Sequence, residues 1–155
     1  MFNITAEIKK AFNGDAWHGN HVMQVLNNVD PEHAFKHFIP GAHSIAEIAL
    51  HLTAWTEEVS SRLTGKTAAE PAMGDWPIPA EKTPKAWEKI IFDFKIANEE
   101  LIRLCENVKE NQWNNIEGER NPALGTGVTS LELVNGLIQH HAYHAGQISL
   151  LSKFT

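Results

Sequence analysis

The sequence contains a single cysteine, Cys105, in 155 residues, so it cannot form the internal disulfides that stabilise small secreted domains. No apolar run reaches the roughly 20 residues of a membrane span, and no basic-then-apolar signal pattern follows Met1. The basic residues form no block, and a formal net charge of −6 does not favour a nucleic-acid surface. These absences predict a cytoplasmic protein with neither a membrane nor a nucleic-acid partner.

Tryptophan and histidine are the abundant residue types. Five Trp and nine His stand out in a composition that is otherwise ordinary for a globular protein, with 43% apolar residues. No internal repeat or low-complexity tract divides the chain, and its length suits a single domain over residues 1–155. We interpret Trp17, Trp55 and Trp87 as core residues, and Cys105 as a small core residue rather than a nucleophile.

Apolar residues recur at helical spacing through most of the chain, whereas no segment shows the alternation of a strand. Ser44 with Glu47 and Thr129 with Glu132 have the spacing of capping boxes, which mark helix starts. The predicted helices cover residues 2–12, 21–29, a short segment at 31–35, then 45–64, 84–108 and 130–152. Four longer helices with apolar faces predict an all-α four-helix bundle.

Two long connections interrupt the predicted helices. The first, residues 65–83, contains three prolines and little periodicity. The second precedes the last helix and includes Gly118, Pro122, Gly125 and Gly127. Loops of this length in a compact domain are often lids or binding loops, and they free consecutive helices from being antiparallel neighbours.

The last predicted helix carries three histidines in the stretch QHHAYHAGQISLL, residues 139–151. Two metal ligands on one helix must lie three or four residues apart to share a face. Both His140 with His144 and His141 with His144 satisfy this spacing. His140 and His144 lie about 40° apart around the helix axis, and Gln147 continues their stripe.

The best candidate for a third ligand is His51 in EIALHLTAW, one turn before Trp55. Three imidazoles leave coordination positions open, which is typical of catalytic rather than structural metal sites. A divalent ion there would polarise a carbonyl or lower the pKa of a bound water or thiol. The alternative is packing, because a histidine-rich helix produces such pairs by chance. His141 and Tyr143 would then cover the bundle surface or a dimer face, and Gln147 would hydrogen-bond a neighbouring helix.

Several stretches resemble the DinB-like superfamily, which includes the YfiT-like metal-dependent hydrolases: AFNGDAWHG, HSIAEIALHLTAW, DWP and TSLELVNGLIQHHAYHAGQISLL. The resemblance covers residues 8–152, and its most specific part is one histidine in the second long helix with H-x-x-x-H directly before A-G-Q. It implies a four-helix bundle with long crossover loops. It also implies a site for zinc, nickel or another divalent ion on His51, His140 and His144, with His141 as the spare histidine.

The resemblance further implies a homodimer and, in some members, use of a low-molecular-weight thiol. The expected function is that of a metal-dependent enzyme, a hydrolase or thiol S-transferase, in which the ion activates water or a small thiol towards a small-molecule substrate. The alternatives are a non-catalytic metal- or ligand-binding, stress-related homodimeric bundle, and a structural homodimer whose histidines are packing residues. The sequence contains no Ser-His-Asp order, phosphate-binding glycine loop or zinc-type CxxC pair that would indicate another chemistry.

Further residues are candidates for a place beside the metal or in its pocket: His18, Glu47, Gln147 and His141. His18 is either a contact near the metal or, as we favour, a turn residue. Glu47 either orients His51 with its carboxylate or, as we favour, caps its own helix. Residues 75–77, Asp-Trp-Pro, either close over the site or pin the long loop to the bundle.

Overall fold

The structure is a computed structural model, and it describes residues 3–115 and 127–154. Helices and loops make up this part of the chain, which confirms the all-α prediction. In chain order the elements are α1 (Ile4–Asn13), α2 (Val22–Asn27), α3 (Ile45–Leu63), α4 (Pro84–Asn107), the short 3-10 helix η1 (Glu110–Gln112) and α5 (Ser130–Leu151).

The helices begin where the sequence supplies caps. The Ser44 hydroxyl accepts a bond from the Glu47 backbone N–H, and the Glu47 carboxylate accepts one from the Ser44 N–H, so both predicted partners of this capping box are engaged. Thr129 and Glu132 do the same at α5. Thr83 caps α4, whose first residue is a proline that has no helical hydrogen bond to lose there.

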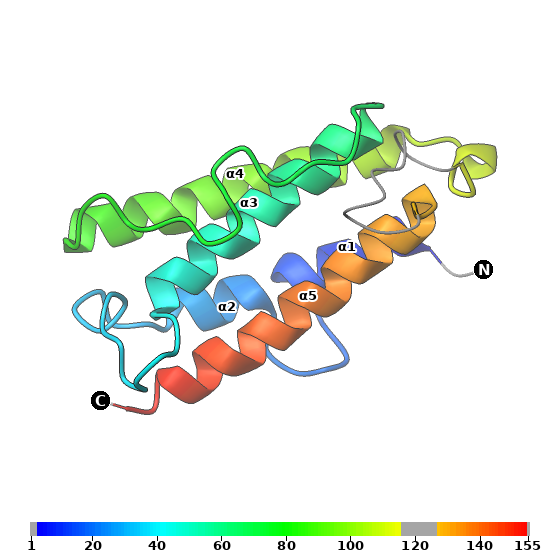
Figure 1. The fold of residues 1–155 in the computed structure, drawn as a ribbon. Helices are drawn as coiled ribbons and strands as arrows, with labels where there is room; N and C mark the ends of the chain where they lie inside the picture. The colour runs from blue at the N-terminus through cyan, green and yellow to red at the C-terminus, as the bar shows by residue number, and fades with distance from the viewer. Residues whose placement is uncertain (1–2, 116–126, 155) are drawn as a thin grey trace.

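The connection between α3 and α4 gives the bundle its unusual order. This segment, residues 64–83, travels back along the length of the bundle before α4 begins (Figure 1). As a result α3 and α4 pack against each other while running in the same direction, and α5 runs the opposite way across α3. The histidines of α3 and α5 therefore belong to two helices that face each other.

The core is apolar apart from a few buried polar side chains. Phe12 of α1 meets Phe94 of α4 edge to face, with ring centroids 6.0 Å apart, and Trp87 is buried beside them. Between the helices lie the fully buried side chains of Thr56 and His141. Burial of Trp87 agrees with the prediction, whereas Trp55 is only partly buried and lines a groove described below.

The prediction of a short helix at residues 31–35 is wrong. The segment forms hydrogen-bonded turns in which the N–H groups of His33 and Ala34 both bond to the Asp30 carbonyl. The Lys36 N–H then bonds to the His33 carbonyl three residues back, at 3.1 Å, and the Ala34 carbonyl accepts a 2.8 Å bond from the Ala46 N–H in the first turn of α3. The segment therefore forms turns that are tied to the start of α3.

The prediction that Trp17 belongs to the core is also wrong. Its side chain is fully exposed, with a relative accessibility of 101%. It lies in a tight turn that the Gly19 N–H closes onto the Ala16 carbonyl at 3.1 Å, and Gly19 adopts the left-handed φ of 110°. Phe2 of the first predicted helix, and Gly118, Pro122 and Gly125 of the second predicted loop, lie outside the described residues.

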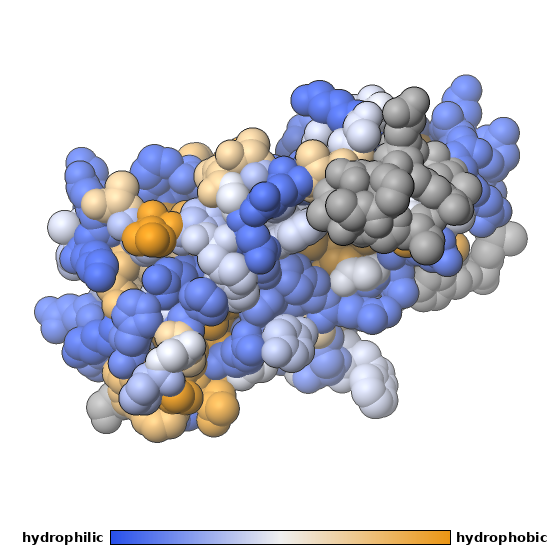
Figure 2. Space-filling view, viewed as in Figure 1, coloured by the Kyte–Doolittle hydropathy of each residue, from blue (hydrophilic) through white to orange (hydrophobic). Residues whose placement is uncertain are grey.

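Hydrophilic side chains predominate on the face shown in Figure 2, and apolar side chains gather towards the C-terminal end. Leu150 and Phe154 are among the exposed apolar residues of that end. Among the described residues, no helix has both the length and the apolar character to cross a membrane.

Candidate metal centre

Three imidazoles from two facing helices converge at one point of the bundle. His51 comes from α3, and His140 and His144 come from α5. Their ring centroids are 4.8, 4.9 and 4.5 Å apart, and one ligand atom from each residue lies within 4.8 Å of the others. The i, i+4 spacing in α5 puts two rings on one face, and the crossing of α3 adds the third.

The outer nitrogen of His51 is held by an oxygen of the long loop. Nδ1 of His51 lies 2.6 Å from the backbone carbonyl oxygen of Asp75 and 3.3 Å from its carboxylate. A carbonyl oxygen only accepts, so Nδ1 carries the proton and donates it. Nε2 is therefore the nitrogen of His51 with a free lone pair, and it lies 2.9 Å from Nε2 of His140.

His144 is held in the same way from its own helix. Its Nδ1 donates to the side-chain Oε1 of Gln147 at 2.6 Å, which again leaves Nε2 as the lone-pair nitrogen. Metal-binding histidines characteristically donate their other N–H to a carboxylate, carbonyl or amide oxygen, which fixes the tautomer and the ring orientation. Gln147, a candidate for a place beside the metal, therefore contacts one of the three clustered histidines directly.

The electrostatics of the cluster keep the α5 imidazoles neutral at physiological pH. Burial, followed by repulsion from the neighbouring histidines, lowers the pKa of His140 to about 4. Burial likewise lowers the pKa of His144 to about 4, against the opposing effect of its bond to Gln147. Neutral imidazole is the form that binds metal ions, so these side chains are in the ligand form across the physiological range.

Comparisons with known proteins show the family and support the fold. The profile of the DinB family matches residues 1–153, nearly the whole chain. The chain belongs to the DinB family. Among solved structures, a DinB-like protein from Bacillus cereus superposes with a TM-score of 0.66 at 18% identity, covering 85% of this chain and 81% of that one. No curated protein sequence matches this chain.

The long loop covers the site in this DinB family member. The Trp76 indole stacks on the His51 ring, with centroids 3.8 Å apart and planes 7° from parallel, and His43 stacks on Trp76 at 3.7 Å. The Asp75 carboxylate accepts a 2.7 Å bond from the Trp55 indole N–H. Asp75 and Trp76 therefore contact the site directly. The sequence left two roles open for this motif, closing over the site or pinning the loop to the bundle, and these contacts place it over the site.

His141, the spare histidine, lies in the core and does not cover a surface or a dimer face, so that part of the packing alternative is wrong. It is fully buried, and burial lowers its pKa to about 3. The Thr56 hydroxyl donates to the Leu52 carbonyl at 2.7 Å, so Nε2 of His141 donates to the Thr56 oxygen at 3.2 Å. This bond joins α3 to α5 close to the cluster, and the ring packs edge-on against Phe94.

The remaining candidates have contacts elsewhere. The Glu47 carboxylate accepts bonds from the Ser44 N–H at 2.7 Å and from His37 Nε2 at 2.8 Å, so Asp75 and not Glu47 orients His51. His18 is exposed in the same turn as Trp17. Cys105 is buried, and burial raises the pKa of its thiol to about 12. It therefore supplies no thiolate at neutral pH.

Proposed function

We propose that the chain binds one divalent ion through His51, His140 and His144 and acts as a metal-dependent enzyme on a small-molecule substrate. When bound, an ion held by three imidazoles supplies Lewis acidity that lowers the pKa of a water or small thiol at its open positions. The reaction is then a hydrolysis or a transfer to a low-molecular-weight thiol. Zinc and nickel suit an all-imidazole site.

The observation that carries this proposal is the orientation of the three rings. Nδ1 of His51 and Nδ1 of His144 both donate to oxygens, which directs their Nε2 lone pairs inward. Nε2 of His51 and His140 are 2.9 Å apart. Ligands about 2.0–2.1 Å from a tetrahedral zinc lie about 3.3 Å from one another, which is close to the separation of this pair, and His144 offers a ligand atom within 4.8 Å of both.

The surrounding residues provide what such a site requires. Asp75 and Gln147 fix two ligand tautomers, and Trp76 covers one face of His51 against solvent. The attacking thiol, where one is used, comes from outside the chain, because the thiol of Cys105 is buried and protonated. Membership of the DinB family supports a metal-binding role for this arrangement.

The test is the metal content of tagless protein measured by mass spectrometry. We expect about one divalent ion per chain in the wild type, and its loss in both His51→Ala and His140→Ala. His37→Ala is the matched control, because this exposed histidine bonds only to Glu47 among its described contacts. Equal metal content in all four proteins, or none after soaking with zinc, nickel and manganese, would refute the proposed site.

Catalysis needs a second measurement on the metal-loaded protein. Hydrolysis and thiol-transfer reactions are screened with the ion that mass spectrometry identifies. Any turnover is expected to disappear with His140→Ala and to return on reloading the stripped wild type. Turnover that stays the same after the bound metal is removed would contradict a metal-dependent enzyme.

A further inference from the structure

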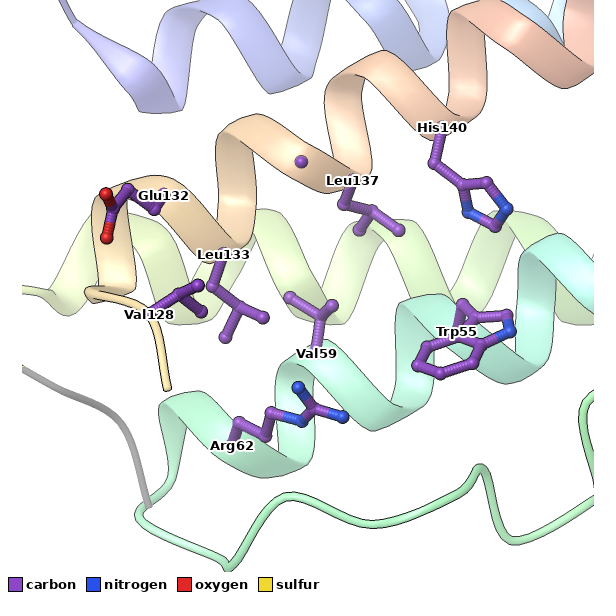
Figure 3. Close-up of a pocket in the computed structure, with 9 residues that line it drawn as sticks. Trp55, Val59, Arg62, Val128, Glu132, Leu133, Leu137 and His140 are labelled. Atoms are coloured by element: carbon purple, nitrogen blue, oxygen red, sulfur yellow. The ribbon is translucent and has the colours of Figure 1, made fainter. Parts of the chain in front are cut away.

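An apolar groove of about 350 Å³ lies between α3 and α5 and ends at the histidine cluster. Leu133, Leu137 and His140 point from α5 towards Val59 and Trp55 of α3 (Figure 3). His140 belongs both to the groove and to the proposed metal site. A molecule whose reacting group sits at the three histidines therefore has this groove beside it.

The walls of the groove are apolar and held in place. The Trp55 indole is fixed by its 2.7 Å bond to Asp75, the residue whose backbone carbonyl also holds His51. Val59 and Leu137 are buried side chains of the core that border the groove. The groove thus has a rigid aromatic face at the metal end and branched aliphatic side chains along its length.

The charged residues at the far end are already paired. Nε of Arg62 donates to the Glu58 carboxylate at 2.8 Å, and Nη2 donates to the Ala69 carbonyl at 3.2 Å. The Glu132 carboxylate accepts bonds from the backbone and hydroxyl of Thr129 in the cap of α5. These pairs reduce the charge available to a ligand, so burial of apolar surface dominates recognition in the groove.

The geometry points to a substrate whose non-reacting part is a compact apolar group, either an aromatic ring or a branched alkyl chain, bound in this groove. The inference rests on the proposed function, since it places the reacting group of that substrate at the histidine triad. The face of Trp55 suits an aromatic ring in particular, because offset and edge-to-face ring contacts add to the burial of apolar area.

Gly136 provides a way to fill the groove without disturbing the fold. It lines the groove from within α5, and a Cβ added to it meets no atom within 4 Å. Leucine is compatible with the helix at this position, because its helix propensity is higher than that of glycine. Gly146, also in α5 and equally free of neighbours around a new Cβ, lies outside the groove lining and provides the matched control.

The experiment compares two probes that share a metal-binding head, acetohydroxamate and benzohydroxamate. Their dissociation constants are measured by calorimetry on zinc-loaded wild type, Gly136→Leu and Gly146→Leu. We expect the wild type to bind benzohydroxamate at least about tenfold more tightly, because only its ring reaches the groove. Gly136→Leu is expected to reduce this ratio to about one while acetohydroxamate affinity and zinc content stay unchanged, and Gly146→Leu is expected to keep the ratio.

A ratio near one in the zinc-loaded wild type, or a ratio that Gly136→Leu leaves unchanged, would overturn the inference. Failure of the metal site itself is recognised separately. In metal-free wild type, benzohydroxamate is titrated while the methyl NMR signals of Val59, Leu133 and Leu137 are followed. Shifts of these signals that Gly136→Leu abolishes would support the groove even in a protein without metal, and their absence would refute it.

Discussion

Replacing Gln147 with leucine is expected to weaken zinc binding by about 10–100-fold. The Gln147 Oε1 accepts a 2.6 Å hydrogen bond from Nδ1 of His144, which keeps the proton there and points Nε2 inward. Leucine has a similar size but no acceptor, so the ring loses both its fixed tautomer and its orientation. A tenfold change equals about 1.4 kcal/mol, so the binding free energy should fall by about 1.4–2.8 kcal/mol.

The assay is a competition titration of zinc against a chelating chromophore at neutral pH. Gln147→Glu retains an oxygen acceptor and is expected to preserve the affinity. Gln139→Leu makes the same chemical change at an exposed position of α5 and is expected to have no effect. If Gln147→Leu binds zinc as tightly as Gln139→Leu while both melt alike without metal, the hydrogen bond does not position the ligand and the reasoning fails.

Three further outcomes follow from the structure. Trp76→Ala is expected to speed the removal of zinc by EDTA because the indole covers the His51 ring, whereas Trp17→Ala removes a fully exposed indole and should not; equal rates would contradict a covering role. Cys105, with a buried thiol whose pKa is raised to about 12, should react with Ellman's reagent at pH 8 only after denaturation, and rapid labelling of the native protein would show that the thiol is accessible. Phe94→Ala should lower the free energy of unfolding by about 3–5 kcal/mol in urea titrations, because the ring is fully buried; a loss below about 1 kcal/mol would mean that the site repacks.

The local features of the fold were readable from the sequence. The capping residues Ser44 and Thr129 predicted the starts of α3 and α5, because a helix start needs acceptors for N–H groups only a few residues away. The i, i+4 spacing of His140 and His144 likewise predicted a shared face, since helix geometry alone determines it. The prediction of a helix at 31–35 failed, because this segment forms turns whose Ala34 carbonyl bonds to a residue distant in sequence, Ala46.

The surroundings of the candidate site depended on contacts that periodicity does not encode. The motif Asp-Trp-Pro stands out in the sequence, but only the path of the crossover loop brings the Asp75 carbonyl to His51 and places Trp76 against its ring. His141 showed a helical spacing as good as that of His140, and only its tertiary contacts with Phe94 of α4 and Thr56 of α3 show that it lies in the core. Outside helices, as at Trp17, residue type alone gave no guide to exposure.

By itself, the sequence determined which segments become the longer helices, which face of each is apolar and which α5 side chains share a side, because these properties arise from neighbours within about one helical turn. Only the tertiary structure decided that α3 crosses α5 at His51, that the Asp75 carbonyl sets the tautomer of His51, and that a groove opens beside His140. These features depend on the register of helices joined by long loops. That register is set by the packing of the whole core and not by any single stretch of the chain.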